Sequence, residues 1–244
     1  MRHLLGYNQQ TYLNSIELYH IGDHIYVVKI KDSHSRAMVF MRAQEFYESS
    51  FEEIISKQFK SSRFVNLYKQ HYGKQEFTYG SDWSGFNIPS EVLEECMFNV
   101  DPDDLNTYDK VMLSIIKTIK RIEPGKYYLL GVDKLANDLL EHEFAHAMYY
   151  TLPEYKMSVN DLTSKCDQVV KLAMYKCITD YGYADHVLPD EMQAYMSTGL
   201  GSIMDKLNIP NIESEMKKYR DVFEEYYSKN LYTSPRKMSV SFKI

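Results

Sequence analysis

The motif His-Glu-Phe-Ala-His at positions 142–146 constrains this chain more than any other part of its sequence. On an α-helix, residues four apart lie on one face about one turn apart, so the two imidazoles point the same way. Two imidazole nitrogens held in this way can bind one zinc ion, and Glu143 lies roughly 100° around the helix from His142. The pattern therefore predicts a helix that holds a metal ion beside a carboxylate able to accept a proton from metal-bound water.

The residues around this motif favour a helix that is buried on one side. Leu140, Phe144 and Met148 recur every four residues and form an apolar stripe, while the two histidines lie on another face. No proline or glycine interrupts residues 135–150. The alternative is an accidental match, which composition alone would produce at roughly a few per cent. Both histidines would then be ordinary core or surface side chains.

Composition restricts the partners that we expect. Of the 244 residues, 44% are hydrophobic and 25% are charged, which is typical of a globular protein with a substantial core. The net charge of −6 argues against nucleic acid as a main partner, because phosphate binding needs a basic surface. No apolar run approaches the ~18 residues of a membrane-spanning helix, and the first ten residues have too little apolar sequence for a signal peptide. We expect neither a nucleic-acid nor a membrane partner.

Cysteine usage favours a cytoplasmic location. Cys96, Cys166 and Cys177 are odd in number and scattered along the chain. If Cys166 and Cys177 share one helix, they are about 16 Å apart, which is too far for a disulfide. We therefore expect reduced, buried thiols.

Short apolar runs near the N-terminus predict a small sheet followed by helices. Runs around residues 16–18, 25–30 and 38–40 are separated by polar turn residues, which predicts a three-stranded antiparallel meander. Helical spacing follows over residues 42–59 and 63–72.

Residues 73–90 break this regularity with three glycines, Pro89 and the only tryptophan, Trp83. Such an aromatic, glycine-bearing segment could line a binding cleft, although a packed Ω-loop is the interpretation that its composition favours. Ser90 is then the expected N-cap of a short helix that runs to Cys96.

The acidic turn at residues 101–104 is the expected boundary between two parts of the chain. Residues 1–100 would form an N-terminal α/β lobe, and residues 101–244 a mostly helical half that holds the motif; one continuous domain is the alternative. The predicted fold class is α+β with a small antiparallel N-terminal sheet.

Helical patterns dominate this second half, and its last residues are polar. In order, we expect a helix over 105–122, a strand over 127–132, the helix of the motif, one long helix over 158–181 capped by Ser158, a helix that starts near Pro189, and a helix over 212–227. The tail at residues 234–237 is expected to be loosely held.

A catalytic zinc ion needs a third protein ligand and one open coordination position. Glu191 is the strongest candidate, because it lies well after His146 on a separate predicted helix. Glu191 could instead be an ordinary carboxylate favoured by the dipole at a helix N-terminus. His186, in the preceding loop, and Asp190 are rival ligands.

This arrangement resembles the gluzincin branch of the zincin metallopeptidases, the thermolysin-like enzymes. Their third ligand is a glutamate on a second helix, in the pattern Asn-Glu-x-x-Ser/Ala-Asp. Residues 190–195, Asp-Glu-Met-Gln-Ala-Tyr, match this pattern at Glu191 and Ala194. Asp190 replaces the asparagine, and Tyr195 replaces the aspartate that usually orients the first histidine. The same block is similar to uncharacterised His-Glu-x-x-His proteins of large phages and DNA viruses.

The resemblance implies a zincin-like fold and a zinc-dependent peptidase acting on a peptide or protein substrate, in the cytoplasm of the cell or of an infected host cell. His142, His146 and Glu191 would hold Zn²⁺, and Glu143 would be the general base. A strand beside the metal helix, either 127–132 or one of the meander, would pair with the extended substrate. The candidates for stabilising the oxyanion are Tyr149, Tyr195 and His186.

Two other functions fit the same residues. The chain could be a non-catalytic protein that keeps a zincin fold for binding or structure, such as a viral assembly component. It could also be a metallohydrolase that acts on a non-peptide amide or ester. An intact Glu143 favours catalysis over the first of these.

Overall fold

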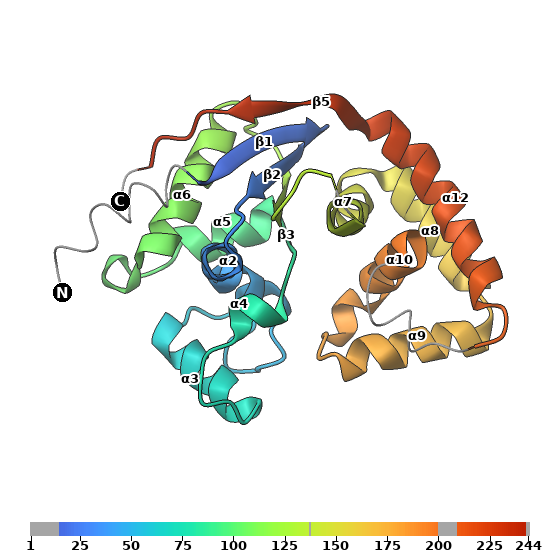
Figure 1. Cartoon of the computed structure of the whole chain (residues 1–244), viewed down its shortest axis with the longest axis horizontal. Coiled ribbons are helices and arrows are strands. Elements are labelled where there is room, and N and C mark those ends of the chain that lie inside the picture. Colours follow the sequence, from blue (N-terminus) through green and yellow to red (C-terminus); the bar gives the residue numbers. More distant parts are fainter. Residues whose placement is uncertain (1–14, 137, 200–208, 243–244) are drawn as a thin grey trace.

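One five-stranded sheet organises the residues that the computed structural model describes, 15–136, 138–199 and 209–242 (Figure 1). In chain order the strands are β1 (Glu17–Gly22), β2 (Ile25–Lys29), β3 (Phe86–Pro89), β4 (Tyr128–Val132) and β5 (Leu231–Met238). They lie side by side in the order β3-β4-β2-β1-β5. Helices make up most of the remaining chain, which confirms the predicted α+β class.

The sheet is mixed rather than antiparallel, which corrects the prediction. β1 and β2 form the expected antiparallel hairpin, with Gly22 opposite Ile25, and β5 pairs antiparallel with β1. β4 instead runs parallel to β2, and β3 runs antiparallel to β4. Parallel strands need a long crossover connection, and the helices between β2 and β4 provide one.

The prediction of a third meander strand around residues 38–40 is wrong, because these residues lie inside helix α2 (Ser33–Glu48). Asp32 caps this helix, and its side chain accepts a hydrogen bond from the backbone N–H of Ser35 at 2.7 Å. Polar residues at such positions favour a turn and a helix cap alike. Because α2 is buried on most sides, its apolar residues are consecutive and show no clear helical period. The helix predicted over 42–59 is therefore shifted towards the N-terminus.

The predicted helices at 63–72, 105–122 and 212–227 are confirmed to within a few residues at their ends. Ser90 is the first residue of its helix, and Pro89 occupies the cap position. In the described ranges, no helix combines the length and apolar character needed to cross a membrane. Within those ranges, the other α-helices are α3 (Ser61–His71), α4 (Tyr79–Asp82), α5 (Ser90–Phe98), α6 (Thr107–Lys120), α7 (Asp138–Thr151), α8 (Pro153–Lys165), α9 (Gln168–Asp180), α10 (Leu188–Thr198) and α12 (Ile212–Asn230).

The single long helix predicted over 158–181 is wrong, because the chain forms α8 and α9 with a break between them. Asp167 starts α9 by accepting a hydrogen bond from the backbone N–H of Val169 at 2.8 Å. Pro153 lies in the first turn of α8, whereas Ser158, the predicted cap, lies inside that helix. An aspartate within a run of helically spaced apolar residues can cap a new helix, and the apolar spacing continues across the break.

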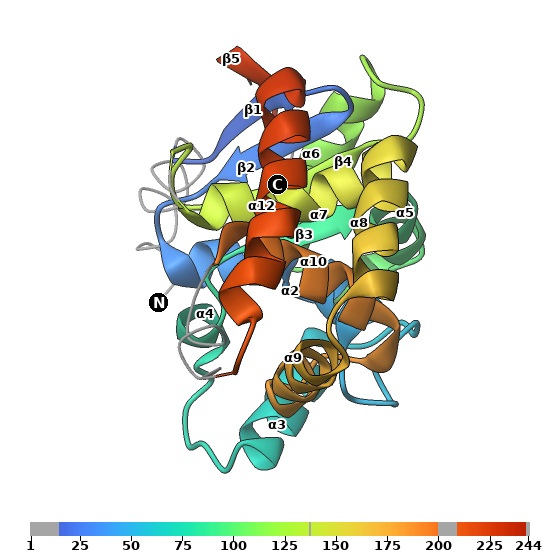
Figure 2. The same ribbon diagram turned by 90° about the vertical axis from the view of Figure 1, so that its right-hand side faces the viewer.

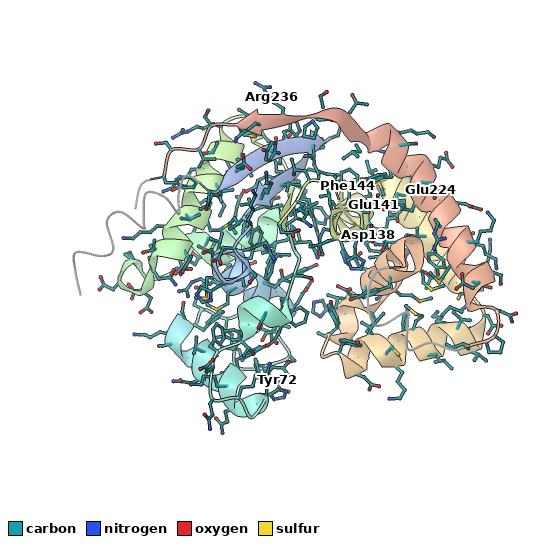
Figure 3. The ribbon with its side chains drawn as sticks, viewed as in Figure 1. Tyr72, Asp138, Glu141, Phe144, Glu224 and Arg236 are labelled. Carbon is teal, nitrogen blue, oxygen red and sulfur yellow. The ribbon has the colours of Figure 1, made fainter. Side chains whose placement is uncertain are left out.

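The tail at residues 234–237 belongs to β5, which corrects the prediction of a loosely held end. Lys237 lies opposite Tyr19 of β1 and forms an ion pair with Glu17. Arg236, labelled in Figure 3, lies on the outer side of this strand. Backbone pairing holds the tail, and its polar side chains carry little information about such pairing.

Strands from both sides of residues 101–104 join this sheet. β1, β2 and β3 precede these residues, whereas β4 and β5 follow them. The sheet therefore connects the parts of the chain at 1–100 and 101–244.

The sheet is covered on both faces, and this arrangement places α7. Alternate residues of β2 point in opposite directions. Tyr26 and Val28 join a buried cluster with α2 and α6, whereas Val27 joins a second cluster that contains Phe144 of α7. α10 packs on α7, and α12 packs on both (Figure 2). The motif helix is therefore held between the sheet and the C-terminal helices.

A buried ion pair joins α2 to the start of α6. Arg42 is 1% exposed and Asp109 is 2% exposed, and two guanidinium nitrogens contact the two carboxylate oxygens at 2.9 Å each. Arg42 also donates to the backbone carbonyl of Phe59 and to Ser61 Oγ. Asp109 in turn accepts a hydrogen bond from the N–H of Asn106, within the capping box of α6.

Replacing Arg42 with leucine should destabilise the fold by about 3–5 kcal/mol, because it leaves the carboxylate of Asp109 buried without its partner. The matched control is Arg63→Leu, since Arg63 pairs with Glu53 at the surface and such pairs contribute about 0–1 kcal/mol. Urea unfolding of both variants measures the difference. Equal midpoints for the two variants would contradict this account of the core.

Candidate metal centre

The two histidines and the glutamate of the motif are buried on one side of α7. His142 and Glu143 are 5% exposed and His146 is 1% exposed. The apolar stripe of the same helix, with Phe144 at its centre, packs into the second hydrophobic cluster as predicted. Burying three polar side chains on one helix is costly unless each finds a partner.

Glu191 lies with the two histidines, as the sequence predicted. It occupies the first turn of α10, which Pro189 helps to start. The Nε2 atoms of His142 and His146 are 3.4 Å apart, and His146 Nε2 is 3.7 Å from Glu191 Oε1. One ligand atom from each of the three buried residues lies within 4.8 Å of the others, so the group could hold a metal ion. The second oxygen, Glu191 Oε2, is buried and has no hydrogen-bond partner in the described part of the chain.

Hydrogen bonds from α10 orient both imidazoles. Thr198 Oγ1 donates to the carbonyl of Ala194, so it accepts from His142 Nδ1, which lies 3.2 Å away. His146 Nδ1 donates to Asp190 Oδ1 at 2.9 Å. With each Nδ1 atom bonded in this way, both Nε2 atoms face the site and can offer a lone pair to a metal ion that replaces any proton there.

Asp190 is the partner of the second histidine, and it does not lie on the ligand side of that ring. Its Oδ1 atom also accepts a hydrogen bond from Gln193 Nε2 at 2.9 Å. The hydroxyl of Tyr155 donates to Gln193 Oε1 at 2.7 Å. The chain Tyr155–Gln193–Asp190 therefore holds His146 in place. The sequence did not predict a role for Gln193 or Tyr155. The one signal for Gln193 was its position, since it is a polar residue three places after Asp190 on a predicted helix.

The electrostatics of the group favour a bound cation. Burial lowers the pKa of His142 well below its ordinary value, so this imidazole is neutral. Burial also lowers the pKa of His146, but the charges of Asp190 and Glu191 outweigh burial and raise it. Burial, with the charges of Asp190 and Glu143, raises the pKa of Glu191. The carboxylates thus draw positive charge to this point, either a proton or a metal ion.

Asn87 of β3 holds the carboxylate of Glu143. Its Nδ2 atom donates to Glu143 Oε2 at 2.8 Å, and its Oδ1 atom accepts from the hydroxyl of Tyr128 at 2.6 Å. Burial raises the pKa of Glu143, while the charge of His146 and the hydrogen bond from Asn87 oppose that rise. A carboxylate with a raised pKa that is held in one orientation is suited to accept and return a proton.

Gly85 is required where the chain passes Glu143. A β-carbon at this position would lie 1.9 Å from Glu143 Oε1 and 2.7 Å from Leu139 Cδ1. Only glycine lets the backbone approach the carboxylate so closely. The glycines at 73–90 were visible in the sequence, but the contact with α7 was not.

A cavity of about 70 Å³ contains this group. Part of the segment at 73–90 lines it, including Trp83, Gly85 and Asn87, so the binding-cleft interpretation applies to this part. Tyr72, labelled in Figure 3, is also in the lining and is 42% exposed, so the cavity opens towards solvent there. The strand β3 within this segment was not predicted, because it has only four residues and ends in a proline.

The three oxyanion candidates lie in different places. The ring of Tyr195 packs on His142 with centroids 4.6 Å apart. The hydroxyl of Tyr149 donates to Asn160, and His186 packs on Tyr47. None of the three candidates is among the residues that line the cavity. Tyr183, which sequence analysis did not select, does line it.

Comparisons with known proteins do not assign the chain to a family. No family model matches, and neither the curated proteins nor the solved structures contain a significant match. The chemistry of this site is therefore inferred from the side chains and contacts described above.

Proposed function

We propose that this chain is a zinc-dependent peptidase of the zincin type, in which Glu143 is the general base. The observation that carries the proposal is the convergence of His142, His146 and Glu191 beside a carboxylate held by Asn87, in one cavity. A metal site with three protein ligands and a nearby base is the arrangement of catalytic zinc sites.

The three ligands fit zinc in chemistry, and the distances from His146 Nε2 to the other two ligand atoms are close to those that zinc requires. Two neutral imidazole nitrogens and one carboxylate oxygen are a known donor set for catalytic zinc. Atoms bound to a tetrahedral zinc ion at about 2.0–2.2 Å lie about 3.3–3.6 Å apart. The two nitrogens are 3.4 Å apart, and the carboxylate oxygen lies 3.7 Å from His146 Nε2. The unpartnered Glu191 Oε2 is a further acceptor that a cation would satisfy.

Zinc, when bound, supplies a Lewis acid that polarises a carbonyl and lowers the pKa of a water molecule towards about 7. Glu143 would then accept a proton from a water molecule as the oxygen of that water attacks the peptide carbonyl carbon. When the carbon–nitrogen bond breaks, Glu143 returns the proton to the departing amine. Asn87 keeps the carboxylate in position throughout, because Tyr128 and β4 fix its own amide group.

Tyr183 is the side chain that we assign to the developing oxyanion. It lines the cavity, and its hydroxyl lies 3.4 Å from that of Tyr195, whose ring packs on His142. Burial and the charge of Glu191 raise the pKa of Tyr183 well above its ordinary value. Its hydroxyl therefore stays protonated and can donate a hydrogen bond to the oxyanion.

An extended peptide substrate would need a strand beside the site with which to pair. The predicted strand over 127–132 is β4, which lies inside the sheet, and both meander strands also have neighbours on each side. β3 is the edge strand, and its Phe86 and Asn87 line the cavity. Backbone hydrogen bonds between such a peptide and β3 would place the peptide beside Glu143.

Purified protein should contain about one zinc ion per chain, and Glu191→Ala should lose most of it, because two imidazoles alone bind zinc weakly. The control is Glu213→Ala, which removes an exposed carboxylate from the first turn of α12. Metal analysis after dialysis measures both. Stoichiometric zinc in Glu191→Ala would mean that Glu191 is only a helix-terminal carboxylate.

Glu143→Gln should keep its zinc and its melting temperature but lose about 100- to 10,000-fold in peptide cleavage, because the amide cannot act as a base. The control is Glu141→Gln on the same helix, since Glu141 is exposed and lies near Asp138 and Glu224, away from the cavity (Figure 3). Cleavage of a mixed peptide library is the measurement. Equal rates for wild type and Glu143→Gln would assign the activity to another base or a contaminant.

Asn87→Ala should lower kcat about tenfold or more and change KM little, because it releases the base rather than the substrate. Loss of this hydrogen bond should also raise the pKa of Glu143, so the acidic limb of the kcat/KM profile should move to higher pH. Asn99→Ala, at the exposed end of α5, is the control. A lower kcat with an unmoved acidic limb would refute a positioning role for Asn87.

A further inference from the structure

One wall of the cavity carries two carboxyl groups that are not among the three candidate metal ligands. Glu45 and Glu48 of α2 line the cavity together with Gln44. Glu45 accepts hydrogen bonds from Tyr79 and Ser49, and Glu48 accepts one from Gln44 Nε2 at 2.6 Å. All these partners are neutral. No ion pair among the described residues includes Glu45 or Glu48.

The lining of the cavity is rich in carboxyl groups and has no lysine or arginine to pair with them. The four carboxyl groups are those of Glu45, Glu48, Glu143 and Glu191. The two charges of Zn²⁺ balance the carboxylates of Glu143 and Glu191. Burial raises the pKa of Glu45 and of Glu48, so each carboxyl group takes its charged form more readily when a cation lies beside it. A positively charged group of a ligand would supply that cation.

Aromatic rings complete this wall. Tyr68, Tyr72, Tyr79 and Trp83 line the same cavity, and Tyr79 bonds to Glu45. Faces of such rings attract ammonium and guanidinium groups. Lys74, whose ammonium lies near the rings of Tyr68 and Tyr72, is not in the lining and forms its ion pair with Asp82.

A buried acceptor on the same wall points to a hydrogen-bond donor. Gln44 uses its Nε2 atom on Glu48, which leaves Gln44 Oε1 buried with no partner among the described atoms. An unpaired carbonyl oxygen in a cavity costs free energy unless a ligand donates to it. Ammonium and guanidinium groups are donors without acceptors, so they match this oxygen and both carboxylates.

We propose that this wall, formed by Gln44, Glu45 and Glu48 with the surrounding aromatic rings, is a subsite for a cationic group of the peptide substrate. The group is either the side chain of lysine or arginine or the free N-terminal ammonium, since the recognition chemistry is the same. The inference rests on the proposed function, because it selects among peptides at that metal site. The size agrees: a cavity of about 70 Å³ admits the end of a slender side chain.

The test measures binding separately from cleavage. Zinc-loaded Glu143→Gln is titrated by calorimetry with three matched peptides: an acetylated peptide with one lysine, the same peptide with norleucine, and the norleucine peptide with a free N-terminus. Emission of Trp83, the only tryptophan and part of the lining, reports whether binding reaches the cavity. At least one cationic peptide should bind about tenfold or more tightly than the acetylated norleucine peptide, and the better one identifies the source of the cation.

Substitutions of the α2 glutamates test whether this wall causes the preference for a cationic peptide. Glu48→Gln, combined with Glu143→Gln, should remove most of the cation preference and change the affinity for the norleucine peptide little. Glu45→Gln is the second variant, and unchanged melting temperatures show that both are folded. Glu52→Gln is the matched control, because Glu52 is exposed and outside the lining. Equal affinities for all three peptides, or a preference that survives in both wall variants, would overturn the proposal.

The outcomes separate this inference from the proposed function. If wild type cuts peptides without regard to charge, the peptidase proposal stands and the cationic subsite is wrong. If no peptide is cut but the preference that depends on Glu48 appears, the subsite stands and the chain binds cationic peptides without hydrolysis.

Discussion

Burial of the polar face of α7 is the constraint on which the site depends. Three titratable side chains are held between the sheet and α10, where unpaired polar groups are expensive. Each has a partner from another element: Thr198 for His142, Asp190 for His146 and Asn87 for Glu143. The partners leave the two Nε2 atoms and one oxygen of Glu191 facing each other. The hydrogen bonds that make burial tolerable thus also aim the candidate ligands.

Carboxylates dominate this interior, and a cation is the common solution to their repulsion. A metal ion would balance Glu143 and Glu191, and in our proposal a basic group of the substrate would balance Glu45 and Glu48. The two proposals therefore share one physical cause, negative charge enclosed with few positive side chains. The two sets lie on different elements, Glu45 and Glu48 on α2 and the other two on α7 and α10, so substitutions can change one set at a time.

The first half of the chain contributes as much to the cavity as the helix of the motif. β3 brings Asn87 to Glu143, and Gly85 lets the backbone pass that carboxylate. α2 brings the acidic wall, and the ion pair of Arg42 with Asp109 anchors this helix to α6. The site therefore requires the whole sheet with the helices on both of its faces.

Local patterns in the sequence were sufficient for the helix at 138–151, its buried stripe and the start of α10. These three features depend on spacing within a few turns, which a helix converts directly into geometry. Glu191 was predicted as the third ligand from its place on a separate helix and from the resemblance of residues 190–195 to the gluzincin pattern. Only the tertiary structure decided the partners of the ligands, the parallel pairing of β4 with β2 and the role of residues 83–87. Asn87 contacts Glu143, and Glu48 lines the cavity, because segments far apart in the sequence pack together. No local periodicity in the sequence encodes such contacts. Buried segments such as α2 are also hard to assign, since a helix that is apolar on most sides loses the period that would identify it.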